Sequence, residues 1–156
     1  LGMAPDSEEL VNAFEQAQAA DLDFEIIATD LGPQYHPNTV KFQISKDNKD
    51  MDIVGSSIGA GCVEIVEIDQ IPTHSINGRT ETLIAQHTDK PGIVASITQA
   101  IAKKKINIAN MYVARERRQG RALTVVTLDQ ACPSDLVKQL EQIKGMLWVR
   151  VLPSLD

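Results

Sequence analysis

Apolar residues recur with two different spacings through the second half of the chain, and the spacings predict six elements. Four segments are typical of strands: residues 81–88, 106–115, 121–129 and 146–152. Two segments have helical spacing, one through Ile93, Ile97 and Ile101, and the other from Pro133 to Gly145. The order strand–helix–strand–strand–helix–strand predicts a ferredoxin-like βαββαβ module, in which two helices cover one face of a four-stranded antiparallel sheet.

The first half of the chain has a weaker pattern, which predicts one helix and four strands. Helical spacing extends over residues 7–21, with Leu10, Phe14 and Ala17 on one face and Asp6 or Ser7 as the cap. The expected strands are residues 23–30, 39–45, 50–54 and 62–68.

Turn-forming residues separate these strands and divide the chain. Residues 46–50 are expected to form a turn, and residues 55–61, with the sequence GSSIGAG, a flexible loop. Residues 71–79 contain Pro72, Asn77 and Gly78 and predict a linker or hairpin between two domains. The fold class is therefore predicted to be α+β, with domains at residues 1–72 and 80–156.

The first candidate site combines two polar segments of the first domain. His36, Asn38 and Thr39 surround a rigid proline turn, and Ser56, Ser57, Gly59 and Gly61 belong to the glycine-rich segment. One segment begins a strand and the other ends its predicted partner. Antiparallel pairing would therefore place both at the same end of the sheet, where their donors could bind a carboxylate or hydroxyl. The alternative is an ordinary turn before a strand.

The second candidate site is the sequence HTDKPG at residues 87–92. A strand ends there and a helix begins at Pro91 and Gly92, so free backbone amides at the helix start could receive a carboxylate. His87 and Asp89 flank this position. The alternative is a strand-to-helix turn without a ligand.

Composition restricts the possible functions. A formal charge of −6 argues weakly against a general nucleic-acid binder, and no apolar run approaches the length of a membrane span. Cys62 and Cys132 lie far apart without a second cysteine nearby, which predicts no metal ligands in this chain and a reducing cytoplasmic environment. No residue is identified as catalytic.

The sequence HTDKPGIVASITQAIAKKKINIANMYVAR resembles an ACT domain, and the resemblance covers about residues 80–153. ACT domains are small regulatory modules that usually bind amino acids at a dimer interface. The resemblance therefore implies a homodimer through this half. It implies an effector site, for L-serine or another small amino acid, that includes the residues His87, Asp89, Pro91, Gly92 and Asn107.

Three segments of the first half resemble the beta chain of bacterial iron–sulfur-dependent L-serine dehydratases. They are LGMAPDSEELVNAFEQAQ, HPNTVKFQIS and GSSIGAGCVEIVEID. The resemblance implies a serine dehydratase beta-type α/β domain whose first part precedes Leu1. The family's loop is commonly GSSIGGG, and Ala60 replaces one of its glycines here.

This resemblance also implies a function. In this family a separate alpha chain carries the [4Fe–4S] cluster, and both chains together convert L-serine to pyruvate and ammonia. The present chain would be an L-serine ammonia-lyase subunit that is inactive alone. Its GSSIGAG segment would face the alpha chain and help to line the substrate or cluster pocket.

Two other functions stay open. Some phosphoglycerate dehydrogenases carry a related domain followed by an ACT domain and use both to sense serine. Such an enzyme would need an upstream dinucleotide-binding fold with a GxGxxG motif, which this sequence lacks. A free-standing amino-acid sensor would bind serine without a partner chain.

Overall fold

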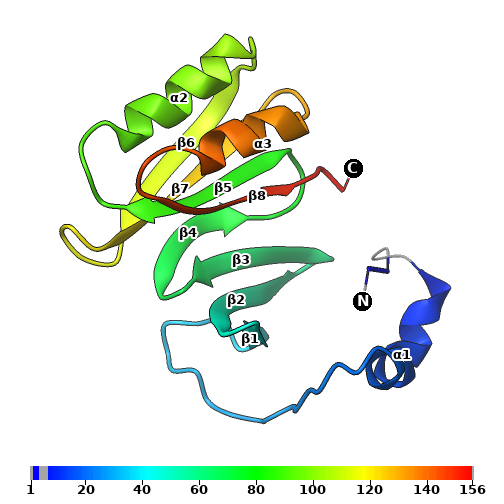
Figure 1. Cartoon of the computed structure of the whole chain (residues 1–156). Coiled ribbons are helices and arrows are strands. Elements are labelled where there is room, and N and C mark those ends of the chain that lie inside the picture. Colours follow the sequence, from blue (N-terminus) through cyan, green and yellow to red (C-terminus); the bar gives the residue numbers. More distant parts are fainter. Residues whose placement is uncertain (1, 4–6, 156) are drawn as a thin grey trace. The chain divides into compact units, whose positions relative to one another are not determined.

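The computed structural model describes residues 2–3 and 7–155, apart from the side chain of Ser75, and consists of two compact units, Leu1–Gly32 and Pro33–Asp156 (Figure 1). In the first unit, a 3₁₀ turn η1 (Glu8–Asn12) continues into helix α1 (Ala13–Ala19). The hydroxyl of Ser7 accepts a hydrogen bond from the Glu9 amide (3.2 Å), which confirms the predicted cap. Asp6, the other expected cap, lies outside the described residues.

The predicted strand at residues 23–30 is wrong, because these residues form no regular element. Ile26 is 77% exposed and Ile27 is 69% exposed. A strand is stabilised by pairing with a neighbour, and the described residues of this unit contain no second strand. Apolar composition alone therefore does not produce a strand here.

The second unit contains two sheets, of which the first is an antiparallel meander. Its strands, in spatial and chain order, are β1 (Thr39–Lys46), β2 (Lys49–Gly59), β3 (Cys62–Ile68) and β4 (Ile71–Ile76). Each connection has two residues with positive φ: Asp47 and Asn48, Ala60 and Gly61, Asp69 and Gln70. Positive φ at both central residues characterises the tight hairpin turn whose twist matches that of the flanking strands.

Two predictions in this sheet require correction. Residues 55–59 are not a loop but the end of β2, and only Ala60 and Gly61 form the turn. The small residues of this stretch lie where the pairing of β2 with β3 is irregular. Of the two expectations for residues 71–79, the linker is wrong, because residues 71–76 are strand β4, which forms a hairpin with β3 and buries Ile71 and Ile76.

The second sheet has the predicted order β5 (Thr82–Thr88), α2 (Ile93–Lys103), β6 (Ile108–Arg115), β7 (Arg121–Leu128), α3 (Ser134–Glu141) and β8 (Met146–Leu152). Its strands are arranged β6-β7-β5-β8, and all neighbours are antiparallel. Both helices lie on one face (Figure 1), where Ile97, Ile101, Leu136 and Leu140 are buried against the sheet. The predicted α+β class and the βαββαβ order are confirmed. Of the helices that the structure describes, none has the length and apolar character needed to span a bilayer.

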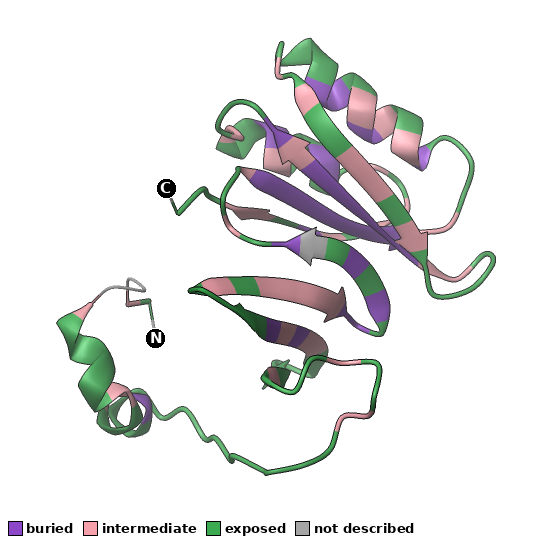
Figure 2. Cartoon of the chain, turned by 180° about the vertical axis from the view of Figure 1, so that it is seen from behind, coloured by how far each residue is buried: buried purple, intermediate pink, exposed green. Residues whose placement is uncertain are grey.

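The other face of the second sheet packs on the first sheet. Ile68 and Ile71 form one apolar cluster with Ile84, Leu123 and Val125, and Trp148 packs against it. The central strands β5 and β7 are consequently buried along most of their length, as Figure 2 shows. Both sheets therefore belong to one compact unit, and the domain division between residues 72 and 80 stays a prediction.

Ala60 gives a first prediction, because its φ of 52° lies in the left-handed region. Ala60→Gly is expected to raise the free energy of unfolding by up to about 1 kcal/mol. Relief of about 1–2 kcal/mol of strain is partly offset by the greater chain entropy of glycine. Urea unfolding measures the difference. Ala102→Gly, an exposed position in α2, is the control and should lower stability by about 1 kcal/mol. An equal loss in both variants would contradict the argument.

Candidate functional site

The two polar segments of the first sheet meet as predicted. Thr39 is the register partner of Ser56, and their hydroxyl oxygens are 2.7 Å apart. The backbone amide of Ser57 donates to the carbonyl of Asn38 at 2.8 Å. The start of β1 and the end of β2 thus form one polar edge, which we call the strand-end cluster (His36, Asn38, Thr39, Ser56 and Ser57).

Some groups of the strand-end cluster are committed to holding its shape. The Thr39 hydroxyl donates to the His36 carbonyl (2.6 Å), so the Ser56 hydroxyl must donate to Thr39. Ser56 is only 3% exposed. The Nδ1 atom of His36 accepts from the backbone amide of Asn38 (3.2 Å). Ser56, Thr39 and His36 therefore stabilise the edge.

Asn38 and Ser57 are the members of the strand-end cluster that can reach a ligand. Both are exposed, and neither side chain makes a hydrogen bond to another of the described residues. Gly59 and Gly61 follow, with φ of 96° and 75°, and no atom of the described chain lies within 4 Å of a Cβ built on either. The glycines are required by the backbone conformation, and the space beside them is open.

Sequence reasoning missed a cation at the same end of the sheet. Arg79 follows the end of β4, and its Nη2 donates to the thiol sulfur of Cys62 (3.0 Å) at the start of β3. Cys62 is the register partner of Gly59. Arg79 is in no ion pair with the described residues, so its guanidinium is available to an anion. No motif marks this arginine, because its position depends on the pairing of β3 with β4.

The turn at residues 87–92 differs from the expected open site, because His87 and Asp89 already make contacts within the chain. The imidazole of His87 is 2% exposed, and its Nε2 lies 2.8 Å from the Thr124 hydroxyl, so it supports the sheet from inside. Asp89 Oδ2 accepts from the Gln119 amide (3.0 Å) and from Arg115 (3.1 Å). These two contacts, the amide first, hold the pKa of Asp89 below its usual value. The carboxylate is therefore ionised and already paired.

The remaining residues of this predicted effector site are not all brought together. Pro91 and Gly92 are exposed at the start of α2, and Gly92 is its N-cap with φ of 91°. Asn107 lies at the opposite end of the sheet, because β6 runs parallel to β5 and Asn107 directly precedes β6. Its side chain donates to Asp129 at 2.6 Å. Within one chain, Asn107 cannot join the turn in a single site.

A polar cleft of about 240 Å³ lies between β4 and the second sheet, and none of the predicted site residues lines it. His74 and Tyr112 stack there with their ring centroids 4.8 Å apart. The other lining residues are Thr73, Ile76, Asn77, Thr80, Thr82, Asn110, Val125 and Thr127. The described lining has no carboxylate, amine or guanidinium, and its ionisable side chains are those of His74 and Tyr112.

The described residues do not fit an iron–sulfur cluster or another metal centre. They include no group of three or more His, Cys, Asp or Glu side chains placed to hold an ion. Cys62 and Cys132 are free and half-buried, and Cys62 begins β3 whereas Cys132 lies between β7 and α3. Burial, reinforced by the charges of Glu81 and Asp135, raises the pKa of the Cys132 thiol, which disfavours the thiolate that a metal requires.

Known proteins are similar in sequence to both halves of the chain. Residues 80–145 match the ACT domain family. These residues form an ACT domain. The expectation drawn from the HTDKPG segment is thereby confirmed, and the matched residues include β5, α2, β6, β7 and α3.

Two L-serine dehydratase beta chains resemble the chain over most of its length. The probable L-serine dehydratase beta chain of Bacillus subtilis is 30% identical over 142 residues, which are 91% of this chain and 64% of that protein. The L-serine dehydratase beta chain of Peptoniphilus asaccharolyticus is 28% identical over 137 residues, covering 87% and 61%. The chain thus spans less than two thirds of each relative. The predicted resemblance to serine dehydratase beta chains is confirmed.

Similarity to a dehydrogenase is more restricted. The D-3-phosphoglycerate dehydrogenase of Synechocystis sp. is 27% identical over 92 residues, which are 59% of this chain and 16% of that enzyme. The resemblance to the beta chains extends further along this chain and further along the relatives. It is therefore the better supported of the two.

Proposed function

We propose that the chain is the beta subunit of a two-chain L-serine dehydratase, which converts L-serine to pyruvate and ammonia in the cytoplasm. The observation that carries the proposal is the similarity to two L-serine dehydratase beta chains over 91% and 87% of this chain. A beta chain implies an alpha chain as its partner. The proposal includes no role for nucleic acid or a membrane.

We propose different roles for the two chains, and the described side chains of this chain support them. They provide no metal-ligand group, so we place the [4Fe–4S] cluster on the alpha chain and expect this chain to be inactive alone. Within the strand-end cluster, Asn38 and Ser57 provide neutral side chains that can donate and accept hydrogen bonds, and Arg79 provides a positive charge at the same end of the sheet. Such groups can hold a substrate carboxylate and amine in a fixed orientation while the reaction takes place.

We also propose a regulatory role for the ACT domain. We assign to it homodimer formation, and binding of L-serine or another small amino acid near Asp89, Pro91 and Gly92. The exposed start of α2 has free backbone amides that suit a carboxylate. The two edges of its sheet, β6 and β8, are available for pairing between copies.

A serine-sensing module is the second candidate. It is favoured by the similarity to phosphoglycerate dehydrogenase, which covers 59% of this chain. In that case the chain would bind L-serine without an alpha chain, and it would take no part in dehydration.

Co-expression with a candidate alpha chain separates the two functions. We expect anaerobically purified complex to release pyruvate from L-serine, and the chain alone to release none. Calorimetric titration of the chain alone with L-serine is the parallel measurement. A chain that binds L-serine but neither associates with an alpha chain nor supports pyruvate release would overturn the proposal in favour of the sensor.

A further inference from the structure

One buried carboxylate connects the two sheets. Asp69 lies in the β3–β4 turn and is 9% exposed. Its Oδ1 accepts from the backbone amide of Asp52 on β2 (2.9 Å), and its own amide donates to the Asp52 carbonyl (2.8 Å). This reciprocal pair fixes the β3–β4 turn to one position along β2.

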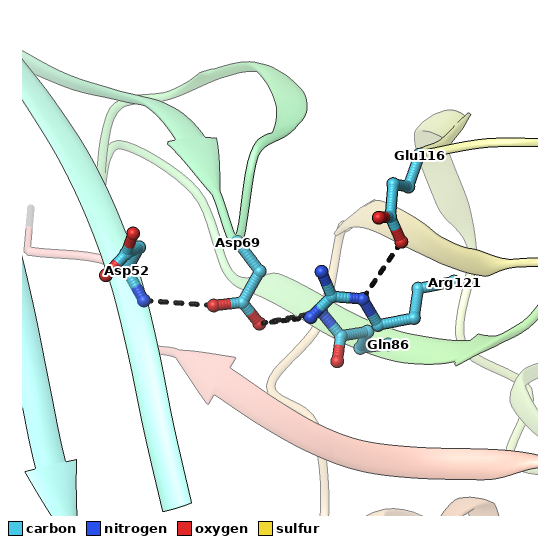
Figure 3. Close-up of polar contacts among 5 residues, drawn as sticks. All are labelled: Asp52, Asp69, Gln86, Glu116 and Arg121. Atoms are coloured by element: carbon cyan, nitrogen blue, oxygen red, sulfur yellow. Dashed lines mark hydrogen bonds and ion pairs between the residues drawn. The ribbon is translucent and has the colours of Figure 1, made fainter.

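The second carboxylate oxygen of Asp69 faces the ACT sheet (Figure 3). Oδ2 accepts from Nε2 of Gln86 on β5 at 2.8 Å, and Nη1 of Arg121 on β7 is 4.0 Å away. Gln86 is 3% exposed, and Arg121 is itself held by Glu116 at 3.1 Å. A nearly buried charge is tolerated only with such partners, so the carboxylate depends on both sheets.

Both partners of Oδ2 are linked to the HTDKPG turn, one along the chain and the other through a hydrogen bond of its neighbour. Gln86 directly precedes His87. Arg121 directly follows Gly120, whose carbonyl accepts from the Asp89 amide at 2.8 Å. The Asp89 carboxylate in turn holds the amide of Gln119 (3.0 Å). A change at the turn therefore acts on residues 119–121 and on the position of the Arg121 side chain.

Hydrogen bonds transmit such a change better than the apolar contact between the sheets does. Hydrophobic burial is non-directional, whereas the bonds of Asp69 require defined positions of donor and acceptor. On the other side of Asp69, β2 leads from Asp52 to Ser57, which is anchored to Asn38. The contacts thus form a continuous connection from one candidate site to the other.

We propose that Asp69 is a positioning residue that couples the HTDKPG turn of the ACT domain to the β2 end carrying Ser57. The significance of the coupling for serine turnover rests on the proposed function. The coupling itself is a property of this chain and is measurable without substrate, partner or cluster.

Amide hydrogen exchange of Ser57, followed by NMR on the full chain, tests the coupling. The turn is perturbed by Asp89→Ala, which removes the acceptor of Gln119 and Arg115. We expect this variant to accelerate Ser57 exchange at least about fivefold, the lower end of the range for coupled sites. In the background of Asp69→Asn, which keeps the side-chain size but removes the charge facing Arg121, Asp89→Ala should leave Ser57 exchange unchanged.

Two controls separate positioning from general loosening. Asp135→Asn makes the same chemical change at a carboxylate paired with Lys104 within the ACT domain, and the fivefold effect should persist in that background. The Val126 amide in the middle of β7 reports global stability, and its exchange should not follow that of Ser57. An equal response of Ser57 in the Asp69→Asn background, or no response in the unmodified background, would overturn the proposal. Failure of the serine dehydratase assay would leave these exchange results unaffected.

Discussion

Replacing Ile71 with alanine is expected to lower the free energy of unfolding by about 2–5 kcal/mol, the range for truncation of a buried isoleucine. Ile71 is 0% exposed and lies in the apolar cluster between the two sheets. The remaining side chains cannot close the gap fully, because the strands on both sides are fixed by their own hydrogen bonds. Urea unfolding followed by circular dichroism measures the loss.

The single tryptophan of the chain makes the same experiment informative about domain structure. Trp148 is on β8 and packs against the cluster, so its fluorescence reports the ACT sheet. If both sheets unfold together, Ile71→Ala shifts the fluorescence and dichroism transitions equally. If the chain instead consists of two domains that divide at residues 72–80 and unfold independently, Ile71→Ala would leave the Trp148 fluorescence transition unchanged. Ile44→Ala, at a 49% exposed position of β1, is the control and should cost far less.

The ACT half could be predicted from sequence because each of its elements has its own buried face and its own boundary. Ile93, Ile97 and Ile101 share one face of α2, and all three are buried. The helix boundary is less accurate, because α3 ends at Glu141 and not at Gly145, which instead lies directly before β8 with φ of 97°. Local pattern and tertiary structure agree along the apolar face of α2.

The first sheet was harder to predict because its strands depend on their neighbours. Residues 55–59 are glycine- and serine-rich, yet pairing with β3, and with β1 at Gly55 and Ser56, makes them a strand. Pro72 argued for a linker, but β4 is an edge strand, where a proline is tolerated. Residues 23–30 have the composition of a strand but do not form one, since no described strand in their unit pairs with them.

The part of the candidate site that results from strand pairing could be predicted from the sequence. Antiparallel order alone places Asn38 beside Ser57. Arg79 and Asp69 could not be predicted, because each acts through a contact with a residue in a different element. A positively charged or acidic residue at a strand end has no periodic signal, and only the register of the sheet shows what it faces.

Ser57→Ala and Asn38→Ala should each lower kcat/KM for L-serine by roughly ten- to a hundredfold in the complex with the alpha chain. Both side chains are exposed and make no hydrogen bond within the described chain, so their truncation removes no internal contact. A hydrogen bond to a substrate carboxylate contributes about 1.5–3 kcal/mol, which accounts for a loss of this size. Steady-state kinetics and the melting temperature are measured on the same purified complex.

Ser45→Ala is a matched control for these variants. Ser45 is an exposed serine on the same hairpin but near its opposite end, where its hydroxyl donates to Asp50 at 2.7 Å. Its truncation should leave kcat/KM unchanged, since this end of the hairpin is distant from the strand-end cluster. If Ser57→Ala and Asn38→Ala instead lower the melting temperature while turnover per folded complex stays constant, the glycine-rich segment has only a structural role. Full activity together with full stability in both variants would exclude these two side chains from the substrate pocket.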